Sequence, residues 1–185
     1  MKKRSKPTSN QPISSQLELP AAGARRSKHD VHYSSQSVEW PTPQWLFDAL
    51  AAEFAFTLDP CSTHENAKCL KHYTRTEDGL RQNWQDEIVF MNPPYGRVIS
   101  SWMQKAYESA RAGALVVALV PARTDCRWWH AWAMRGEIRL IKGRVKFEGA
   151  TNGAPFPSAI VIFRPPGFAL KSANLGNSPN VQNQN

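Results

Sequence analysis

Long hydrophobic runs are missing from this sequence of 185 residues. No apolar stretch approaches the roughly 18 residues that a membrane-spanning helix needs, so we expect no membrane partner. The start, MKKRSKPTSN, is basic but leads into no apolar segment, which argues against a secretory signal. Cysteine is scarce too, and the odd set Cys61, Cys69 and Cys126 favours free thiols in a reducing compartment over a disulfide framework. We therefore expect a cytoplasmic protein.

Acidic residues are few relative to basic ones. Lys and Arg number 23 against 15 Asp and Glu, which gives a formal net charge of +8 and a pI near 9.7. This balance favours polyanionic partners, nucleic acid above all. The segment 1–36 is rich in Ser, Lys, Arg, Pro and Gln, so we expect a disordered basic arm that either attracts phosphates or only keeps the chain in solution. The polar end, 168–185, is expected to be disordered as well.

The middle segment, 37–167, is long enough for one domain with a proper core. Buried-strand runs such as ALVVALVPA alternate there with amphipathic stretches. Helices are predicted at 42–54, 98–113 and 125–136, and strands at 56–60, 114–122, 137–147 and 158–165, with a further strand that starts at 87 and runs into a proline-rich loop ending at 95. Thr42 is the expected N-cap of the first helix, with Pro43 at its first position.

This alternation of strands and helices predicts an α/β fold with a mainly parallel sheet. The last two predicted strands have no helix between them, only the loop EGATNGAPFP, so we expect a C-terminal antiparallel strand pair. No internal repeat is visible.

The tetrapeptide Asn92-Pro93-Pro94-Tyr95 follows directly after the strand IVFM. In an open α/β sheet, ligands bind at the carboxyl ends of the strands, which is where this tetrapeptide should lie. An exocyclic amine on an aromatic ring is a poor nucleophile unless hydrogen-bond acceptors draw it toward tetrahedral geometry. The Asn92 side-chain oxygen and the Pro93 carbonyl can supply two acceptors, the prolines stiffen the loop, and Tyr95 offers a face for stacking an extruded base.

Five motifs in one order resemble the phage-type DNA N6-adenine methyltransferase family, over about residues 40–165. They are Thr42-Pro43-Gln44-Trp45-Leu46-Phe47, Leu58-Asp59-Pro60-Cys61, Asn92-Pro93-Pro94-Tyr95, Val120-Pro121-Ala122-Arg123-Thr124-Asp125 and Ala154-Pro155-Phe156-Pro157-Ser158. The resemblance implies a Rossmann-like fold and S-adenosyl-L-methionine as cofactor. It also implies an enzyme of phage or prophage type that modifies DNA in the cytoplasm of a bacterial host, at its nucleoid.

The same resemblance assigns a set of cofactor-binding residues. They are Trp40, Thr42, Pro43, Asp59, Pro60, Cys61, Asp78 and Asn92. Asp59 would lie near the methionine end, where a carboxylate favours the ammonium and sulfonium charges. Asp78 would face the ribose or adenine of the cofactor. In the wider superfamily the first motif leads into a glycine-rich loop, whereas here it continues as Ser62-Thr63-His64-Glu65-Asn66, without glycine.

The expected partner is double-stranded DNA with the target adenine flipped out, bound by a monomer or a weak homo-oligomer. Arg123, Thr124 and Asp125 follow a strand on the same rim as Asn92, and Arg123 can pair with a phosphate. Trp128 would line the DNA cleft or lie in the core. The loop 148–157, with Asn152 and Phe156, would help to recognise the sequence.

Several alternatives stay open at this point. The same tetrapeptide serves methylation of cytosine N4 or of protein glutamine, and a chain without the glycine loop could also be a DNA-binding module that has lost catalysis. The spacings Cys61-x2-His64 and Cys69-x2-His72 suggest zinc ligands, but structural zinc sites more often show Cys-x2-Cys, so we expect no metal.

Overall fold

The computed structural model describes residues 40–168. The predicted basic arm and all but the first residue of the predicted polar tail therefore lie outside the described residues. No helix within the described part of the chain is long and apolar enough to cross a membrane.

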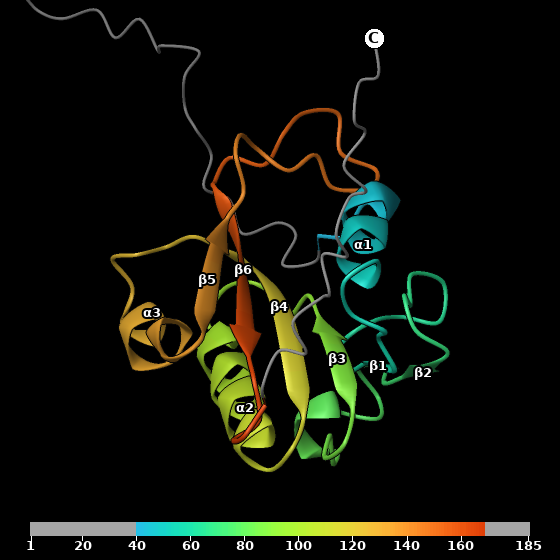
Figure 1. The fold of residues 1–185 in the computed structure, drawn as a ribbon. Coiled ribbons are helices and arrows are strands. Elements are labelled where there is room, and N and C mark those ends of the chain that lie inside the picture. The colour runs from blue at the N-terminus through green and yellow to red at the C-terminus, as the bar shows by residue number, and fades with distance from the viewer. Residues whose placement is uncertain (1–39, 169–185) are drawn as a thin grey trace, which may run out of the picture. The chain divides into compact units, whose positions relative to one another are not determined.

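The described residues form a mixed α/β structure around one six-stranded sheet (Figure 1). Its strands are β1 (Leu58–Asp59), β2 (Lys71–His72), β3 (Ile88–Met91), β4 (Leu115–Pro121), β5 (Glu137–Leu140) and β6 (Ser158–Phe163), in the spatial order β2-β1-β3-β4-β6-β5. The strands β2, β1, β3 and β4 run parallel, while β6 pairs antiparallel with both β4 and β5. The prediction of a mainly parallel sheet with a C-terminal antiparallel pair is thus confirmed.

The core lies along β4 and β6, whose residues are all buried. Their pairing runs from Val116 opposite Phe163 to Pro121 opposite Ser158, so β6 is inserted between β4 and β5. Strands buried on both faces need apolar side chains at every position, which explains why both segments lack the alternation of a half-exposed strand.

Within residues 40–168, three α-helices and two short 3₁₀-helices accompany the sheet. They are α1 (Gln44–Ala51), α2 (Ile99–Arg111), α3 (Arg127–Ala131), η1 (Gly79–Arg81) and η2 (Ala133–Arg135). The helix α2 packs against β4 and β6 through an apolar stripe at helical spacing (Figure 1). That stripe comprises Ile99, Trp102, Met103, Ala106 and Ala110, all buried. On α1, Phe47 meets Phe90 of β3 edge-on, with ring centroids 5.1 Å apart.

Several of the expected elements differ from the prediction. The helix expected at 42–54 and the strand expected at 56–60 are both shorter, as α1 and β1. The helix expected at 125–136 is α3 followed by η2, because Trp132 between them has non-helical angles. The strand expected at 137–147 ends at Leu140, because Gly143, with φ of +83°, lies in a turn that leaves the sheet. Thr42 does not cap α1, because Pro43 is the N-cap residue and the Thr42 hydroxyl accepts a hydrogen bond from Asn92 instead. The short strand β2 was not predicted, since Lys71–His72 carries no strand pattern.

The direction in which successive strands are added to the sheet reverses after β2. From β1 the chain passes to β2 on one side, and then returns to β3 on the other side of β1. At such a switch point the connections diverge and leave a crevice at the carboxyl ends of the two central strands. Here the central strands are β1 and β3, which end at Asp59 and Met91.

Gly79 is required by a close approach between chain segments near this crevice. A Cβ atom at Gly79 would overlap the carbonyl oxygen of Pro60 and lie 3.2 Å from the ring of Trp102. We expect Gly79→Ala to lower the free energy of unfolding by about 1–3 kcal/mol, the usual effect of overpacking. Urea denaturation measures it, with Gln104→Ala on the exposed face of α2 as the control, expected within about 0.5 kcal/mol of wild type. Equal effects of the two substitutions would contradict the prediction.

Candidate active site

A pocket of about 720 Å³ lies at the carboxyl ends of β1 and β3. This volume is within the range of about 300–1,000 Å³ that ligand pockets of proteins usually have. Its walls come from the segment before α1, the loop after β1, the loop that contains η1, the Asn92-Pro93-Pro94-Tyr95 loop and the start of α2. The predicted location of the tetrapeptide at a ligand-binding strand end therefore agrees with the position of the pocket.

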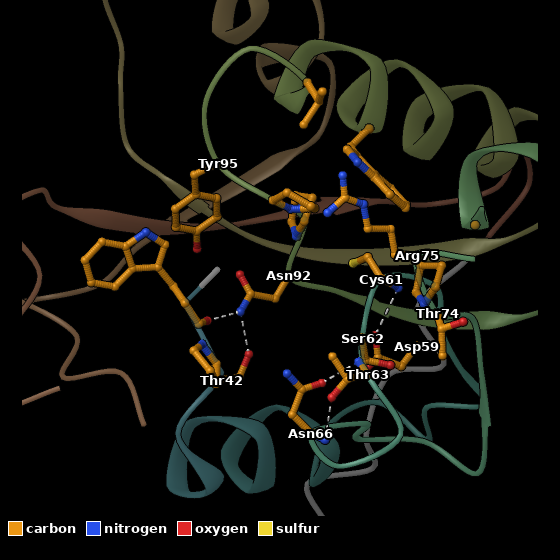
Figure 2. A pocket seen from close by; sticks show the side chains of 18 of the residues that line it. Thr42, Asp59, Cys61, Ser62, Thr63, Asn66, Thr74, Arg75, Asn92 and Tyr95 are labelled. Atoms are coloured by element: carbon orange, nitrogen blue, oxygen red, sulfur yellow. Dashed lines mark hydrogen bonds between the residues drawn. The ribbon is translucent and has the colours of Figure 1, made fainter. Parts of the chain in front are cut away.

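The side-chain amide of Asn92 is held in one orientation by two acceptors (Figure 2). Its Nδ2 donates to the backbone carbonyl of Trp40 at 2.6 Å and to the Thr42 hydroxyl oxygen at 2.8 Å. A carbonyl oxygen can only accept, so the NH₂ group must face Trp40 and the amide oxygen must face the other way. Figure 2 shows that oxygen on the side of Tyr95, away from Thr42.

The Asn92 Oδ1 atom is buried and has no hydrogen-bond partner within the described range 40–168. Buried polar atoms are nearly always paired, and an exception calls for an explanation such as a ligand. Asn92 lines the pocket, so this oxygen is an acceptor available to a donor that enters there.

The rest of the tetrapeptide forms a fixed wall. Pro93 and Tyr95 are buried, and the Tyr95 hydroxyl lies 3.4 Å from the carbonyl oxygen of Leu119. The Tyr95 ring packs against Phe147 and Phe156, with centroids 6.3 and 5.6 Å away. Burial raises the pKa of Tyr95 well above its ordinary value, so the phenol stays neutral at physiological pH.

Asp59, at the end of β1, organises the loop that follows it. Its Oδ2 accepts from the backbone N–H of Lys68 at 3.0 Å, and its Oδ1 lies 3.4 Å from the N–H of Cys61. Desolvation by burial is the largest influence on this carboxyl group and raises its pKa, while these N–H donors act in the opposite direction. A buried carboxylate that lines a pocket would gain from a cationic ligand.

Side chains replace the missing glycine loop after Cys61. The Asn66 Oδ1 atom accepts from the Thr63 N–H at 2.7 Å, and the Asn66 N–H is 3.3 Å from the Thr63 hydroxyl (Figure 2). The Ser62 hydroxyl is buried without a partner within the described residues. Further along, the Lys68 ammonium donates to Gln44 of α1 at 2.9 Å and to Glu148 at 3.1 Å, which ties the loop to α1 and to the segment after β5.

The cysteines and histidines of this loop do not gather into a larger cluster. His64 Nδ1 and His72 Nε2 are 2.8 Å apart, but no group of three or more His, Cys, Asp or Glu side chains in the described part of the chain is placed to hold a metal ion. Burial, with Asp59 nearby, raises the pKa of the Cys61 thiol well above its ordinary value, so this thiol is no ready nucleophile.

Seven of the eight predicted cofactor residues line the pocket. These are Trp40, Thr42, Asp59, Pro60, Cys61, Asp78 and Asn92. Pro43 does not: it is buried at the start of α1, and Pro41 lines the pocket instead. Asp78 has a left-handed backbone, with φ of 52°, and its carboxylate lies 3.3 Å from both the Leu80 N–H and the Arg81 side chain.

None of the six predicted DNA-binding residues lines the pocket. Arg123, Thr124, Asp125 and Asn152 are exposed outside it. Phe156 is half-buried and packs on Trp40 at 5.2 Å. The assignment of Trp128 to DNA needs correction: it is only 8% exposed and belongs to the hydrophobic core, because α3 buries both Trp128 and Trp129.

Sequence reasoning missed several pocket residues. Among them are Lys68 and Arg75, from the loops on either side of β2, and Leu80 and Trp102, which form an apolar part of the wall. Trp102 falls on the buried stripe of α2, so helical periodicity alone marks it as core. No motif distinguishes Arg75, and only the path of the chain brings it to the pocket (Figure 2).

Fold and site together define a class of α/β protein with a ligand pocket at a switch point. An Asn-Pro-Pro-Tyr loop lines this pocket, and its amide oxygen has no partner among the described residues. Comparison with known families agrees with this class: the model of the DNA N-6-adenine-methyltransferase (Dam) family matches residues 31–178. The chain belongs to this family of methyltransferases. It is also similar to "Putative methyltransferase YfdM" of Escherichia coli (strain K12), with 33% identity over 64 residues, which are 31% of this chain and 70% of that protein.

The hydrogen bond from Asn92 to Thr42 predicts a role for the threonine in methyl transfer. Thr42→Val keeps the shape of this buried side chain but removes the acceptor, so the amide of Asn92 is held by Trp40 alone. Loss of one such bond amounts to about 0.5–1.5 kcal/mol, which corresponds to a roughly two- to tenfold lower kcat. Steady-state kinetics should show the loss in kcat more than in KM.

Thr42→Ser is the matched control, because it keeps the hydroxyl oxygen and loses only a methyl group. We expect its kcat to stay close to wild type. A serine variant as slow as the valine variant would contradict an effect through the hydrogen bond and would point to packing instead.

The raised pKa of Asp59 predicts that the free energy of unfolding depends on pH. Because its folded-state pKa is raised above the reference value of 3.8, the folded protein holds a proton that the unfolded chain has already released. The contribution of Asp59 is therefore greatest below about pH 3.8 and falls as the pH rises through the folded pKa. We expect the difference in unfolding free energy between wild type and Asp59→Asn to shrink across that window, as measured by urea denaturation. A difference independent of pH would contradict the raised pKa.

Proposed function

We propose that this chain transfers a methyl group from S-adenosyl-L-methionine to N6 of adenine in double-stranded DNA. The observation that carries the proposal is the buried Oδ1 of Asn92, which has no partner among residues 40–168 while Trp40 and Thr42 hold the amide nitrogen. The choice of adenine in DNA as the substrate rests on the matched family, which is described as DNA N-6-adenine-methyltransferase.

The residues of the pocket fit the proposed cofactor. A molecule with a sulfonium and an ammonium group suits the carboxylate of Asp59, because burial raises the pKa of this group and a nearby cation would favour its charged form. The side chains of Leu80 and Trp102 offer an apolar surface to a nucleoside base, and the carboxylate of Asp78 can accept from ribose hydroxyls. When bound there, this cofactor supplies the methyl group.

The chain itself prepares the amine. Asn92 Oδ1 accepts a hydrogen bond from one N–H of the exocyclic amine and the Pro93 carbonyl accepts one from the other, which draws the nitrogen lone pair out of conjugation with the ring. The Tyr95 ring, fixed by Phe147 and Phe156, gives the base a neutral aromatic face. No general base is needed before transfer, because the methylated ammonium product is acidic. Positioning and preorganised acceptors provide most of the rate increase.

The target must leave the duplex to reach these groups. Asn92 is half-buried and Tyr95 is 6% exposed, so neither can touch a base that stays stacked in a helix. Enzymes that modify a base inside a duplex extrude the nucleotide into such a pocket. Arg123, Thr124, Asp125 and Asn152 remain our candidates for DNA contacts outside the pocket.

Asn92→Ala tests the proposal directly. It removes the acceptor, and by analogy with the removal of one preorganised hydrogen-bonding group from an oxyanion hole, we expect methyl transfer to slow by about 10²–10³-fold. Unmethylated DNA is incubated with the protein and methyl-labelled cofactor, and nucleosides are analysed by mass spectrometry. Wild type should yield N6-methyladenine. Cofactor affinity, measured by calorimetry, should stay within about threefold in the variant if the amide acts mainly on the amine.

Asn83→Ala is the control, since Asn83 bonds only to the nearby Gln85 N–H and does not line the pocket. It should methylate DNA like wild type. Detection of N4-methylcytosine instead of N6-methyladenine would keep the mechanism and overturn the substrate. If the protein neither binds the cofactor nor methylates any base, the proposal is overturned. DNA binding without these two activities would then favour a module without catalysis.

A further inference from the structure

Three cations lie along the segment that leads from β5 toward the loop before β6. Lys142, Arg144 and Lys146, here called the basic stripe, are exposed, whereas Val145 and Phe147 between and beside them are each 2% exposed. The apolar side chains thus anchor the segment to the core while the cations face solvent. An anchored segment holds its charges in place, which a flexible loop does not.

The basic stripe has no acidic partner. None of its three side chains forms an ion pair or a side-chain hydrogen bond with any residue between 40 and 168. The acidic residue nearest in sequence, Glu148, is engaged with Lys68 at 3.1 Å. By contrast, Arg139 on β5 is held by Glu53 and Glu137. Cations without partners at an exposed site are free to bind an anion from outside.

The stripe borders the pocket. Phe147, which follows Lys146, packs against Trp40 at 5.3 Å and Tyr95 at 6.3 Å. The next residue, Glu148, donates its N–H to the Pro41 carbonyl at 3.0 Å. Figure 1 shows this β5–β6 connection, in orange, at the same end of the sheet as α1. The cations therefore belong to a segment that packs against residues lining the active-site pocket.

The connection folds back on itself beside Arg144. The Ala154 N–H donates to the Val145 carbonyl at 2.8 Å, and a Cβ atom at Gly153 would lie 2.9 Å from the Cβ of Arg144. This close approach brings Asn152, a predicted DNA contact, next to the stripe. The exposed residues Arg144 and Asn152, whose side chains can both donate to phosphate oxygens, are thus close to each other on the surface.

We propose that Lys142, Arg144 and Lys146 bind the phosphate backbone of DNA next to the adenine that enters the pocket. The proposal rests on the proposed function, because it takes the occupant of the pocket to be a DNA base. Each phosphate neutralised by a Lys or Arg releases counterions, so the affinity falls with salt by a slope of about 0.9 per contact. Three cations account for a slope change of about 2–3.

The test measures binding of the full chain to duplex DNA by fluorescence anisotropy at a series of salt concentrations. In the variant Lys142→Gln/Arg144→Gln/Lys146→Gln, the slope of log K against log[salt] should shrink by about 2–3, and the affinity at low salt should fall at least tenfold. Cofactor affinity should not change, since none of the three side chains lines the pocket. Circular dichroism melting verifies that the variant is folded.

A second variant removes the same number of charges elsewhere. Lys105→Gln/Arg111→Gln/Arg135→Gln changes cations of α2 and η2 that do not line the pocket, two of which rest on aromatic rings. Its salt slope should stay within about one unit of wild type. Equal losses in both variants would overturn the proposal, because net charge alone would then explain the binding.

The outcomes separate this proposal from the proposed function. If wild type methylates adenine and the stripe variant keeps the wild-type salt slope, only the proposed role of the basic stripe is overturned. Wild type that binds DNA through the stripe but methylates no base keeps the DNA surface and overturns the reaction. Wild type that binds no duplex DNA overturns both, and stripe-dependent binding that is tighter for double-stranded RNA overturns DNA as the partner.

Discussion

The hydrogen bond from the Asn92 amide to the Trp40 carbonyl determines what the rest of the site can do. Because a carbonyl cannot donate, this bond at 2.6 Å turns the NH₂ group toward Trp40 and leaves the oxygen on the side of Tyr95 (Figure 2). The Trp40 carbonyl is itself held in place, since the Trp40 ring lies between Phe147 and Phe156 and the neighbouring Pro41 carbonyl accepts from Glu148. Distant parts of the chain thus fix one amide.

Burial has different consequences for Asn92 and Asp59, two polar residues that line the pocket. For Asn92 it leaves a neutral acceptor without water, which strengthens any hydrogen bond that a substrate can offer. For Asp59 it disfavours the charged form and raises the pKa, so a cationic ligand beside this carboxylate would stabilise the charged form at neutral pH. Both features give up stability in the free protein in favour of ligand binding, as functional sites commonly do.

Local patterns predicted the strands that carry the site, but not the contacts that complete it. The run IVFM followed by Asn92 is a local signal, and parallel pairing of β3 with β1 and β4 places its end in a crevice. Thr42 shows the limit: its local preference is to cap α1, yet a partner fifty residues away takes the hydroxyl. Trp128 shows it too, because exposure depends on what packs over a residue. The loop 60–70 lacks the glycines of related enzymes, and its Thr63–Asn66 bonds have no sequence signature.

In the proposed complex, the β5–β6 connection links the DNA contacts to the pocket. Phe147 and Phe156 pack against Trp40 and Tyr95, which line the pocket, while the residues around and between the two phenylalanines stay largely exposed. A charge on Lys146 is one residue from the ring that packs on Tyr95. In the proposed complex, phosphate contacts would therefore act on a segment that is continuous with the aromatic wall, so docking of the backbone and placement of the base would depend on the same anchored residues. In that proposed arrangement, one connection between two strands would carry the phosphate contacts and also support the aromatic residues that line the pocket.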